Sequence, residues 1–135
     1  MEIRTADEAD LDEILAHNNL AVPAVNELTR VDLAWFAEHA HSFLVAPTDD
    51  GAVAGFLIGL DGPGLAYESL NYAWFSERYE RFIYVDRIVV ASEGRGSGTG
   101  GRLYDEFAAR GAAGGHAHML AEVNVRPRND GSLRF

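Results

Sequence analysis

The sequence contains no cysteine and no lysine among its 135 residues. Without cysteine the chain can form no disulfide bond, no thiolate metal site and no thioester with one of its own side chains. All 11 basic residues are arginines, and against 21 acidic residues they give a formal net charge of −10 at pH 7. Because there is no basic patch, this charge disfavours nucleic acid as a partner and favours a cationic ligand such as an amine.

Long apolar runs and a signal peptide are also missing from the sequence. No stretch reaches the length that crosses a bilayer, so we expect no membrane partner and a cytoplasmic location. We predict no metal site. The length suits one domain with a proper core, and there are no repeats or linkers, so residues 1–135 are expected to form a single domain.

Apolar periodicity and turn residues predict alternating helices and strands along the chain. Thr5 and Glu8 are predicted to form a capping box at the start of the first helix. Gly55 and Gly59 lie within one predicted strand and indicate a bulge or a close backbone approach. In order, the predicted elements are a strand at 2–5, helices at 7–19 and 29–40, a hairpin of strands 42–46 and 52–60, a helix at 69–79, a strand at 83–90, a helix at 99–111 and a strand at 119–125.

A glycine-dense loop separates the apolar strand Ile83–Val90 from the amphipathic helix that begins near Thr99. Glycines have no side chain to pack, but they allow a sharp turn that brings several N–H groups toward one point. Free amides and the positive end of a helix dipole together form an anion site. The predicted ligand is therefore a phosphate of a nucleotide-type cofactor.

Two further cofactor types and a turn without any ligand compete for this loop. A P-loop would need Lys and then Ser or Thr where Arg102 and Leu103 stand. The segment Gly96–Gly101 spells the dinucleotide fingerprint, with Glu122 placed like a ribose-binding acid, but too few residues follow to build further βα units. A turn without a ligand would leave several amides without an obvious partner.

The loop segment Arg95–Gly100 resembles the R-x-x-G-x-G acetyl-CoA signature of the GNAT superfamily of N-acetyltransferases, with Val90 five residues before the arginine. Downstream, the segment Asn129-x-x-Ser132-x-x-Phe135 is similar to the N-x-x-A-x-x-(L/F) helix of that family. The order of predicted elements also fits, so the resemblance covers nearly the whole chain. It implies an α/β (α+β) fold with a central mixed, mostly antiparallel sheet flanked by helices.

This resemblance implies direct transfer of an acetyl group from acetyl-CoA to a primary amine of a small molecule or an amino terminus. The loop amides would hold the pyrophosphate, while the preceding strand and a downstream asparagine would hold the pantetheine arm. The implied cofactor-binding residues are Ile88, Val89, Val90, Arg95, Gly96, Ser97, Gly98, Thr99, Gly100 and Asn129.

One acid lies in the middle of the apolar strand, where it is costly unless it is used or paired. Strand alternation places Asp86 on the same side as Tyr84, Ile88 and Val90. We predict that Asp86 is the general base or an anchor for the substrate ammonium. The alternative is a structural ion pair, whose partner would have to come from elsewhere because alternation turns Arg87 to the opposite face.

The amine site is predicted from two segments, each of which allows two interpretations. The aromatics of the segment Asp61–Arg81 either line the acceptor pocket or simply cover the sheet. Asparagines and an acid between the first two helices are either acceptor contacts, as in the family, or solvated helix ends. The predicted substrate-binding residues are Tyr72, Trp74, Tyr84, Glu122 and Asn124, with Asn18, Asn19, Asn26 and Glu27 as further candidates.

The family resemblance stops short at the C-terminal end. A tyrosine that commonly serves as the general acid follows the position of Phe135 in the family, and here the chain ends. The expected domain is therefore a C-terminally shortened one that lacks the last helix and strand. A second hypothesis is accordingly a non-catalytic acyl-CoA-binding or sensing domain, and a homodimer stays open as an assembly.

Overall fold

The computed structural model describes residues 2–62, 70–79, 82–91, 98–115 and 118–121. Its sheet has five strands in the order β1-β2-β3-β4-β5. The first four strands pair antiparallel, and β4 pairs parallel with β5. The predicted mixed, mostly antiparallel sheet is confirmed, whereas the predicted loss of a last helix and strand lies outside the described residues. The strands are β1 (Arg4–Thr5), β2 (Ser42–Pro47), β3 (Val53–Gly62), β4 (Phe82–Val90) and β5 (His118–Ala121).

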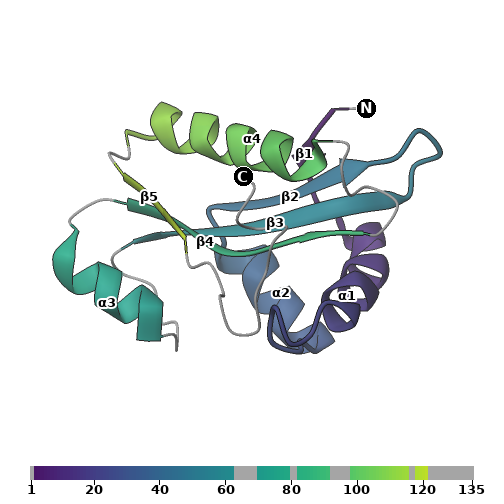
Figure 1. Cartoon of the computed structure of the whole chain (residues 1–135), viewed down its shortest axis with the longest axis horizontal. Helices are drawn as coiled ribbons and strands as arrows, with labels where there is room; N and C mark the ends of the chain where they lie inside the picture. The colour runs from purple at the N-terminus through teal and green to yellow at the C-terminus, as the bar shows by residue number, and fades with distance from the viewer. Residues whose placement is uncertain (1, 63–69, 80–81, 92–97, 116–117, 122–135) are drawn as a thin grey trace.

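Helices cover both faces of this sheet (Figure 1). The long helix α4 lies along one face, while α1 and α2 lie on the other, and α3 stands near the end of the sheet where β4 begins. The predicted helices are present with small shifts at their ends. Their bounds are η1 (Glu8–Asp10, a 3-10 turn), α1 (Leu11–Leu20), α2 (Arg30–His39), α3 (Leu70–Arg78) and α4 (Thr99–Ala113). Among the described helices, none is both long and apolar enough to cross a membrane.

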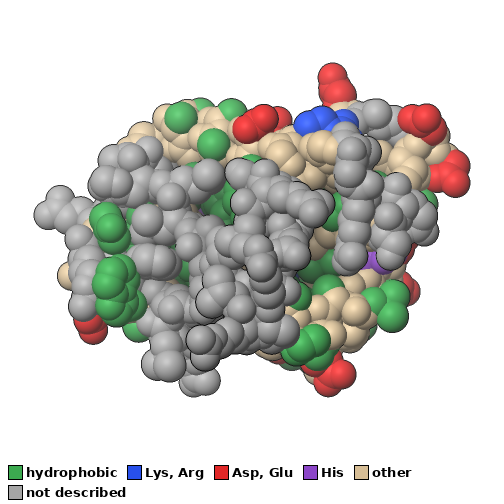
Figure 2. Space-filling view, in the orientation of Figure 1, with side chains coloured by type: hydrophobic (Ala, Val, Ile, Leu, Met, Phe, Trp, Pro, Cys, Tyr) green, Lys and Arg blue, Asp and Glu red, His purple; other side chains and the backbone are tan. Residues whose placement is uncertain are grey.

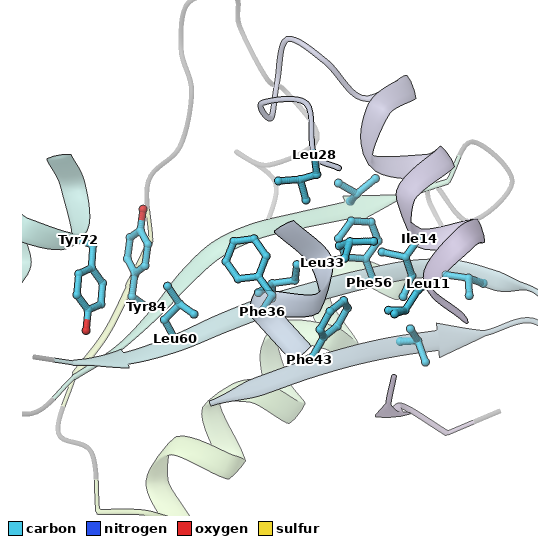
Figure 3. Packing of buried hydrophobic residues seen from close by; sticks show 14 of the residues in the cluster. Leu11, Ile14, Leu28, Leu33, Phe36, Phe43, Phe56, Leu60, Tyr72 and Tyr84 are labelled. Carbon is cyan, nitrogen blue, oxygen red and sulfur yellow. The ribbon is translucent and has the colours of Figure 1, made fainter. Parts of the chain in front are cut away.

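The sheet separates two apolar clusters, because side chains along a strand alternate between its faces. The larger cluster lies under α1 and α2 and includes Ile14, Leu33, Phe36 and Phe56 (Figure 3). The smaller cluster lies under α4 and contains Leu44, Leu57, Ile83, Val85, Leu103 and Phe107. Each strand of the β2–β3–β4 centre thus contributes to both layers of the core, as expected for a sheet that is buried on both faces.

The first helical segment begins at a different cap from the predicted one. Thr5 lies in β1, and Asp7 is the N-cap instead, accepting a hydrogen bond from the amide of Ala9 at 3.0 Å. Asp10 completes the box, because its Oδ2 accepts from the amide of Asp7 at 2.9 Å. The prediction of Thr5 and Glu8 is wrong because Asp7 and Asp10 have the same spacing and the chain stays bonded to β2 past Thr5, the amide of Ala6 donating to the carbonyl oxygen of Phe43 at 2.7 Å.

Glycines in β3 permit close approach, as predicted. A Cβ built on Gly59 would lie 2.2 Å from Cζ of Phe107, so α4 packs directly onto the strand there. A Cβ on Gly55 would lie 2.9 Å from the carbonyl oxygen of Val89 and 3.3 Å from Cγ2 of Thr99. The two glycines therefore set how closely α4, and in particular its first turn, lies on the sheet.

Candidate active site

A β-bulge in β4 lies at the centre of the candidate site. Ile58 of β3 pairs with Arg87, and the next residue, Gly59, pairs with Val85, so Asp86 is the extra residue of β4. A bulge of this kind adds one residue to one strand and changes the face to which the following side chains point. Tyr84, before the bulge, belongs to the cluster under α1 and α2.

The bulge corrects the predicted orientation of the side chains in β4. Ile88 packs against the cluster under α4, so it lies on the opposite face from Tyr84. Val89, which simple alternation would place with Val85, instead belongs to the cluster under α1 and α2. The prediction that Asp86 shares one face with Tyr84, Ile88 and Val90 is therefore wrong, because the alternation changes phase at Asp86 itself.

The carboxylate of Asp86 forms an ion pair within the protein. Nε of Arg87 donates to Oδ2 of Asp86 at 2.9 Å, and the two side chains are 4% and 5% exposed, respectively. The expectation that Arg87 faces away from Asp86 is wrong for the same reason, since the bulge removes the strict alternation between neighbours. The ion-pair contact that was weighed against a catalytic role is thus present, and the partner is the adjacent residue.

Arg87 also holds the segment between α1 and α2. Its Nη1 donates to Oδ1 of Asn18 at 3.0 Å and to the carbonyl oxygen of Asn26 at 3.1 Å. Its Nη2 donates to Oδ1 of Asn26 at 2.6 Å. The guanidinium lies 5.5 Å from the ring centroid of Phe36, a cation–π geometry. Arg87 is buried, and its role was missed by the sequence reasoning because its partners are distant in the chain.

The asparagines in and after α1 range from buried Asn18 through half-buried Asn19 to exposed Asn26. Asn18 is fully buried, and its Nδ2 donates to Oδ1 of Asn19 at 2.9 Å and to the carbonyl oxygen of Asn26 at 3.0 Å. Asn19 in turn bonds both backbone groups of Leu28, at 3.0 and 3.1 Å. Of the two alternatives for these asparagines, a solvated helix end is excluded for Asn18. All three asparagines form hydrogen bonds in one network.

The predicted aromatic residues divide into buried and exposed ones. Tyr72 of α3 and Tyr84 of β4 are 3% and 2% exposed, and their rings meet edge to face with centroids 6.1 Å apart (Figure 3). The hydroxyl of Tyr72 donates to the carbonyl oxygen of Asp61 at 2.8 Å. Trp74 is 48% exposed, and apolar side chains are visible over α3 in Figure 2. The two tyrosine rings are therefore part of the core, whereas Trp74 reaches solvent.

The start of α4 has the features of an anion site. Gly98 is the N-cap with φ of 81°, and a Cβ built on it would meet nothing within 4 Å among the described residues. The first turn contains no acidic residue, and exposed Arg102 lies at its end. A helix N-terminus attracts an anion and repels a cation, so this turn favours a negatively charged ligand.

The first turn of α4 also lies beside the end of β4. Thr99 is buried, and its Cγ2 approaches Gly55, which pairs with Val90 in the sheet. Deeper along α4, burial raises the pKa of the Tyr104 phenol, which packs on the same cluster as Ile88. The first turn of α4 thus lies close to the end of β4 at Val90.

The described pairing of β4 with β5 covers only the first part of β4. It runs from Phe82 opposite His118 to Val85 opposite Ala121, which brings it to the edge of the bulge.

Several predicted site residues lie outside the described residues. These are Arg95, Gly96, Ser97, Glu122, Asn124 and Asn129. Within the described part, no group of three or more His, Asp or Glu side chains could hold a metal ion.

The profile of the acetyltransferase (GNAT) family matches residues 9–135. The chain belongs to the GNAT family. A comparison with curated proteins finds no match. Solved structures share the fold: an acetyltransferase of Agrobacterium tumefaciens aligns at 17% identity and a TM-score of 0.72, over 99% of this chain and 87% of that one. A transcriptional regulator of Bacillus halodurans aligns at 20% identity and a TM-score of 0.74, over 98% and 87%.

A third similar structure is an aminoglycoside N-acetyltransferase in complex with CoA, at 16% identity and a TM-score of 0.72, over 98% of this chain and 85% of that one. At such identities the likeness establishes the fold alone. For this GNAT chain, the family and the fold therefore follow from the comparisons, and the assignment of individual side chains depends on the geometry given above.

Proposed function

We propose that this GNAT chain is an N-acetyltransferase that binds acetyl-CoA and acylates a primary amine of a small molecule or an amino terminus by direct transfer. The observation that carries the proposal is the start of α4. It has a glycine N-cap at positive φ, no described atom within 4 Å of a Cβ built on that cap and no acid in the first turn, and it lies beside the end of β4. A diphosphate fits there because amides and helix dipole point to one spot.

The cofactor side of the proposed site follows β4 into α4. The first-turn amides near Gly98, Thr99 and Gly100, together with Arg95, Gly96 and Ser97, would hold the pyrophosphate, and Asn129 would contact the pantetheine arm. The backbone of β4 from Ile88 to Val90 would pair with that arm like an added strand. When bound, acetyl-CoA supplies the activated acetyl group.

The amine side of the proposed site centres on the bulge. We assign Asp86 to accept the ammonium proton or to anchor the ammonium, since it is the acid at the bulge of β4. A positioned base contributes about 10²–10⁴-fold to rate. Trp74 would provide an exposed aromatic surface, Tyr72 and Tyr84 would support it from below, and Glu122 and Asn124 would complete the pocket.

A variant of Gly98 tests the cofactor site, and the chain offers a matched control. Gly51, in the β2–β3 turn, also has positive φ, 89°, and a Cβ built on it also meets nothing within 4 Å among the described residues. Gly98→Val and Gly51→Val should therefore suffer similar backbone strain, but only Gly98→Val should lose the thermal stabilisation given by CoA and acetyl-CoA. Equal CoA binding by wild type and Gly98→Val would refute the assignment of the loop.

A non-catalytic acyl-CoA-binding domain is the second candidate, and the buried ion pair favours it. The Oδ2 atom of Asp86 is already bound by Arg87, and both side chains are almost fully buried. Thermal shift with CoA, acetyl-CoA and NAD, followed by thiol release with a panel of amines, separates the candidates. Stabilisation by CoA without thiol release would favour binding, whereas stabilisation by NAD alone would contradict both candidates.

A further inference from the structure

Arg87 joins four parts of the molecule through one buried side chain. It contacts Asp86 in β4, Asn18 in α1, Asn26 in the connecting segment and the ring of Phe36 in α2. The bulge makes this possible, because it turns Arg87 to the face that α1 and α2 cover. Without the extra residue, the guanidinium would point to α4 and reach none of the last three partners.

The contacts to the connecting segment are specific for its position. Nη1 and Nη2 bind the carbonyl oxygen and Oδ1 of Asn26, so one guanidinium holds both the backbone and the side chain of that residue. Asn18 donates to the same carbonyl oxygen, at 3.0 Å. A planar guanidinium presents several donors in fixed directions, so it fixes geometry more strictly than an ammonium does.

The segment continues from Asn26 to Leu28, whose backbone is held by the side chain of Asn19. Leu28 itself packs into the larger cluster beside Phe36 (Figure 3). Residues 26–28 therefore lie against the bulge through a short chain of hydrogen bonds that begins at Arg87. Any displacement of this segment therefore acts on Arg87, which also holds Asp86.

We propose that Arg87 is a positioning residue that sets the wall of the amine site, by holding residues 26–28 at a fixed distance from the bulge. This inference rests on the proposed function, because it assumes that the amine approaches Asp86. Arg87 acts through Asn26 and does not touch the reacting atoms. Its loss should therefore affect the amine much more than CoA, whose pyrophosphate would bind beyond the end of β4, at the start of α4.

The test uses Asn26, because changing it removes one anchor of the cluster while leaving the ion pair of Asp86 in place. Asn26→Ala removes the Oδ1 acceptor of Nη2, and Asn26→Asp keeps it. Asn26→Ala removes a charge-assisted hydrogen bond that holds the segment in place, so it should raise the KM for the amine by up to about tenfold. Asn26→Asp should restore the KM to within about twofold of wild type.

The probes are an aminoglycoside, a polyamine and a tripeptide with a free amino terminus, with thiol release as the assay. The affinity for CoA should stay within about twofold in both variants. A second readout is amide hydrogen exchange at Leu28, which should be faster in Asn26→Ala and unchanged in Asn26→Asp. Val53→Ala, a core truncation at the start of β3, serves as a control that lowers stability without raising the KM for the amine.

The outcomes separate this inference from the proposed function. If the wild type is active and both Asn26 variants have the wild-type KM for the amine, the positioning role alone is overturned. An increase in KM shared by Asn26→Ala, Asn26→Asp and Val53→Ala would also overturn it, since stability alone would then explain the effect. A wild type that binds no CoA and releases no thiol with any amine would overturn the proposed function and, with it, the role of Arg87.

Discussion

Gly59 permits the contact between β3 and α4, and its replacement by alanine gives a quantitative prediction. A Cβ on Gly59 would lie 2.2 Å from Cζ of Phe107, and two further atoms of the same ring would lie 2.4 and 2.8 Å away. Carbon atoms pack at about 3.5–4.0 Å, so the ring must move by roughly an ångström or more. Phe107 is 0% exposed, so it cannot move into solvent.

The size of the effect follows from two opposing contributions. Overpacking a core costs about 1–3 kcal/mol, whereas Gly→Ala stabilises by about 0.4–1 kcal/mol through the unfolded chain. Gly59→Ala should therefore destabilise the protein by about 1–2 kcal/mol, a decrease in Tm of roughly 4–8 °C for a chain of this size. Urea unfolding followed by circular dichroism measures the free energy, and a thermal scan measures the Tm.

A double-mutant cycle tests the physical reason. Phe107→Leu makes room for the new methyl group, so the double variant should be more stable than the sum of the single effects predicts, by about 1 kcal/mol. Gly101→Ala is the control, because a Cβ there meets nothing within 4 Å in the described part of the chain and alanine favours the helix. If Gly59→Ala unfolds at the wild-type temperature, or if the two changes are additive, the steric explanation is refuted.

Three further predictions concern the cap, the base and the N-terminal ion pair. Gly98→Ala should lower stability by about 1 kcal/mol, measured in urea, because an alanine at φ of 81° is strained; a gain in stability would contradict the observed backbone. Asp86→Asn should lower turnover by about 10²-fold or more and leave CoA affinity unchanged; wild-type turnover would exclude Asp86 as the base. Hydrogen bonds from Arg4 lower the pKa of Asp10 in the folded protein. The carboxylate therefore stabilises the fold at a pH above its unfolded pKa of about 3.9, and this contribution is lost as the pH falls through its folded pKa. The difference in Tm between wild type and Asp10→Asn should accordingly shrink on going from about pH 5 to about pH 2, and a constant difference would contradict this linkage.

Several elements could be read from local sequence because the relevant rules are local. Thr29 begins α2 with Asp32 as its capping partner, and Gly98 begins α4 at positive φ. The D-G turn between β2 and β3 follows from backbone preferences of single residues. The network of Asn18 with Arg87 has no local signal, since the two residues are 69 positions apart in the chain.

The face to which each side chain of β4 points was decided only in the folded sheet. Alternation predicts one phase from Phe82 to Val90, and the pairing of Ile58 and Gly59 with Arg87 and Val85 breaks it at Asp86. The sequence by itself determined the order of elements and the approximate bounds of the helices, because these depend on neighbouring residues. Tertiary structure decided the partner of Asp86 and the direction of Arg87, because a bulge depends on how one strand pairs with another.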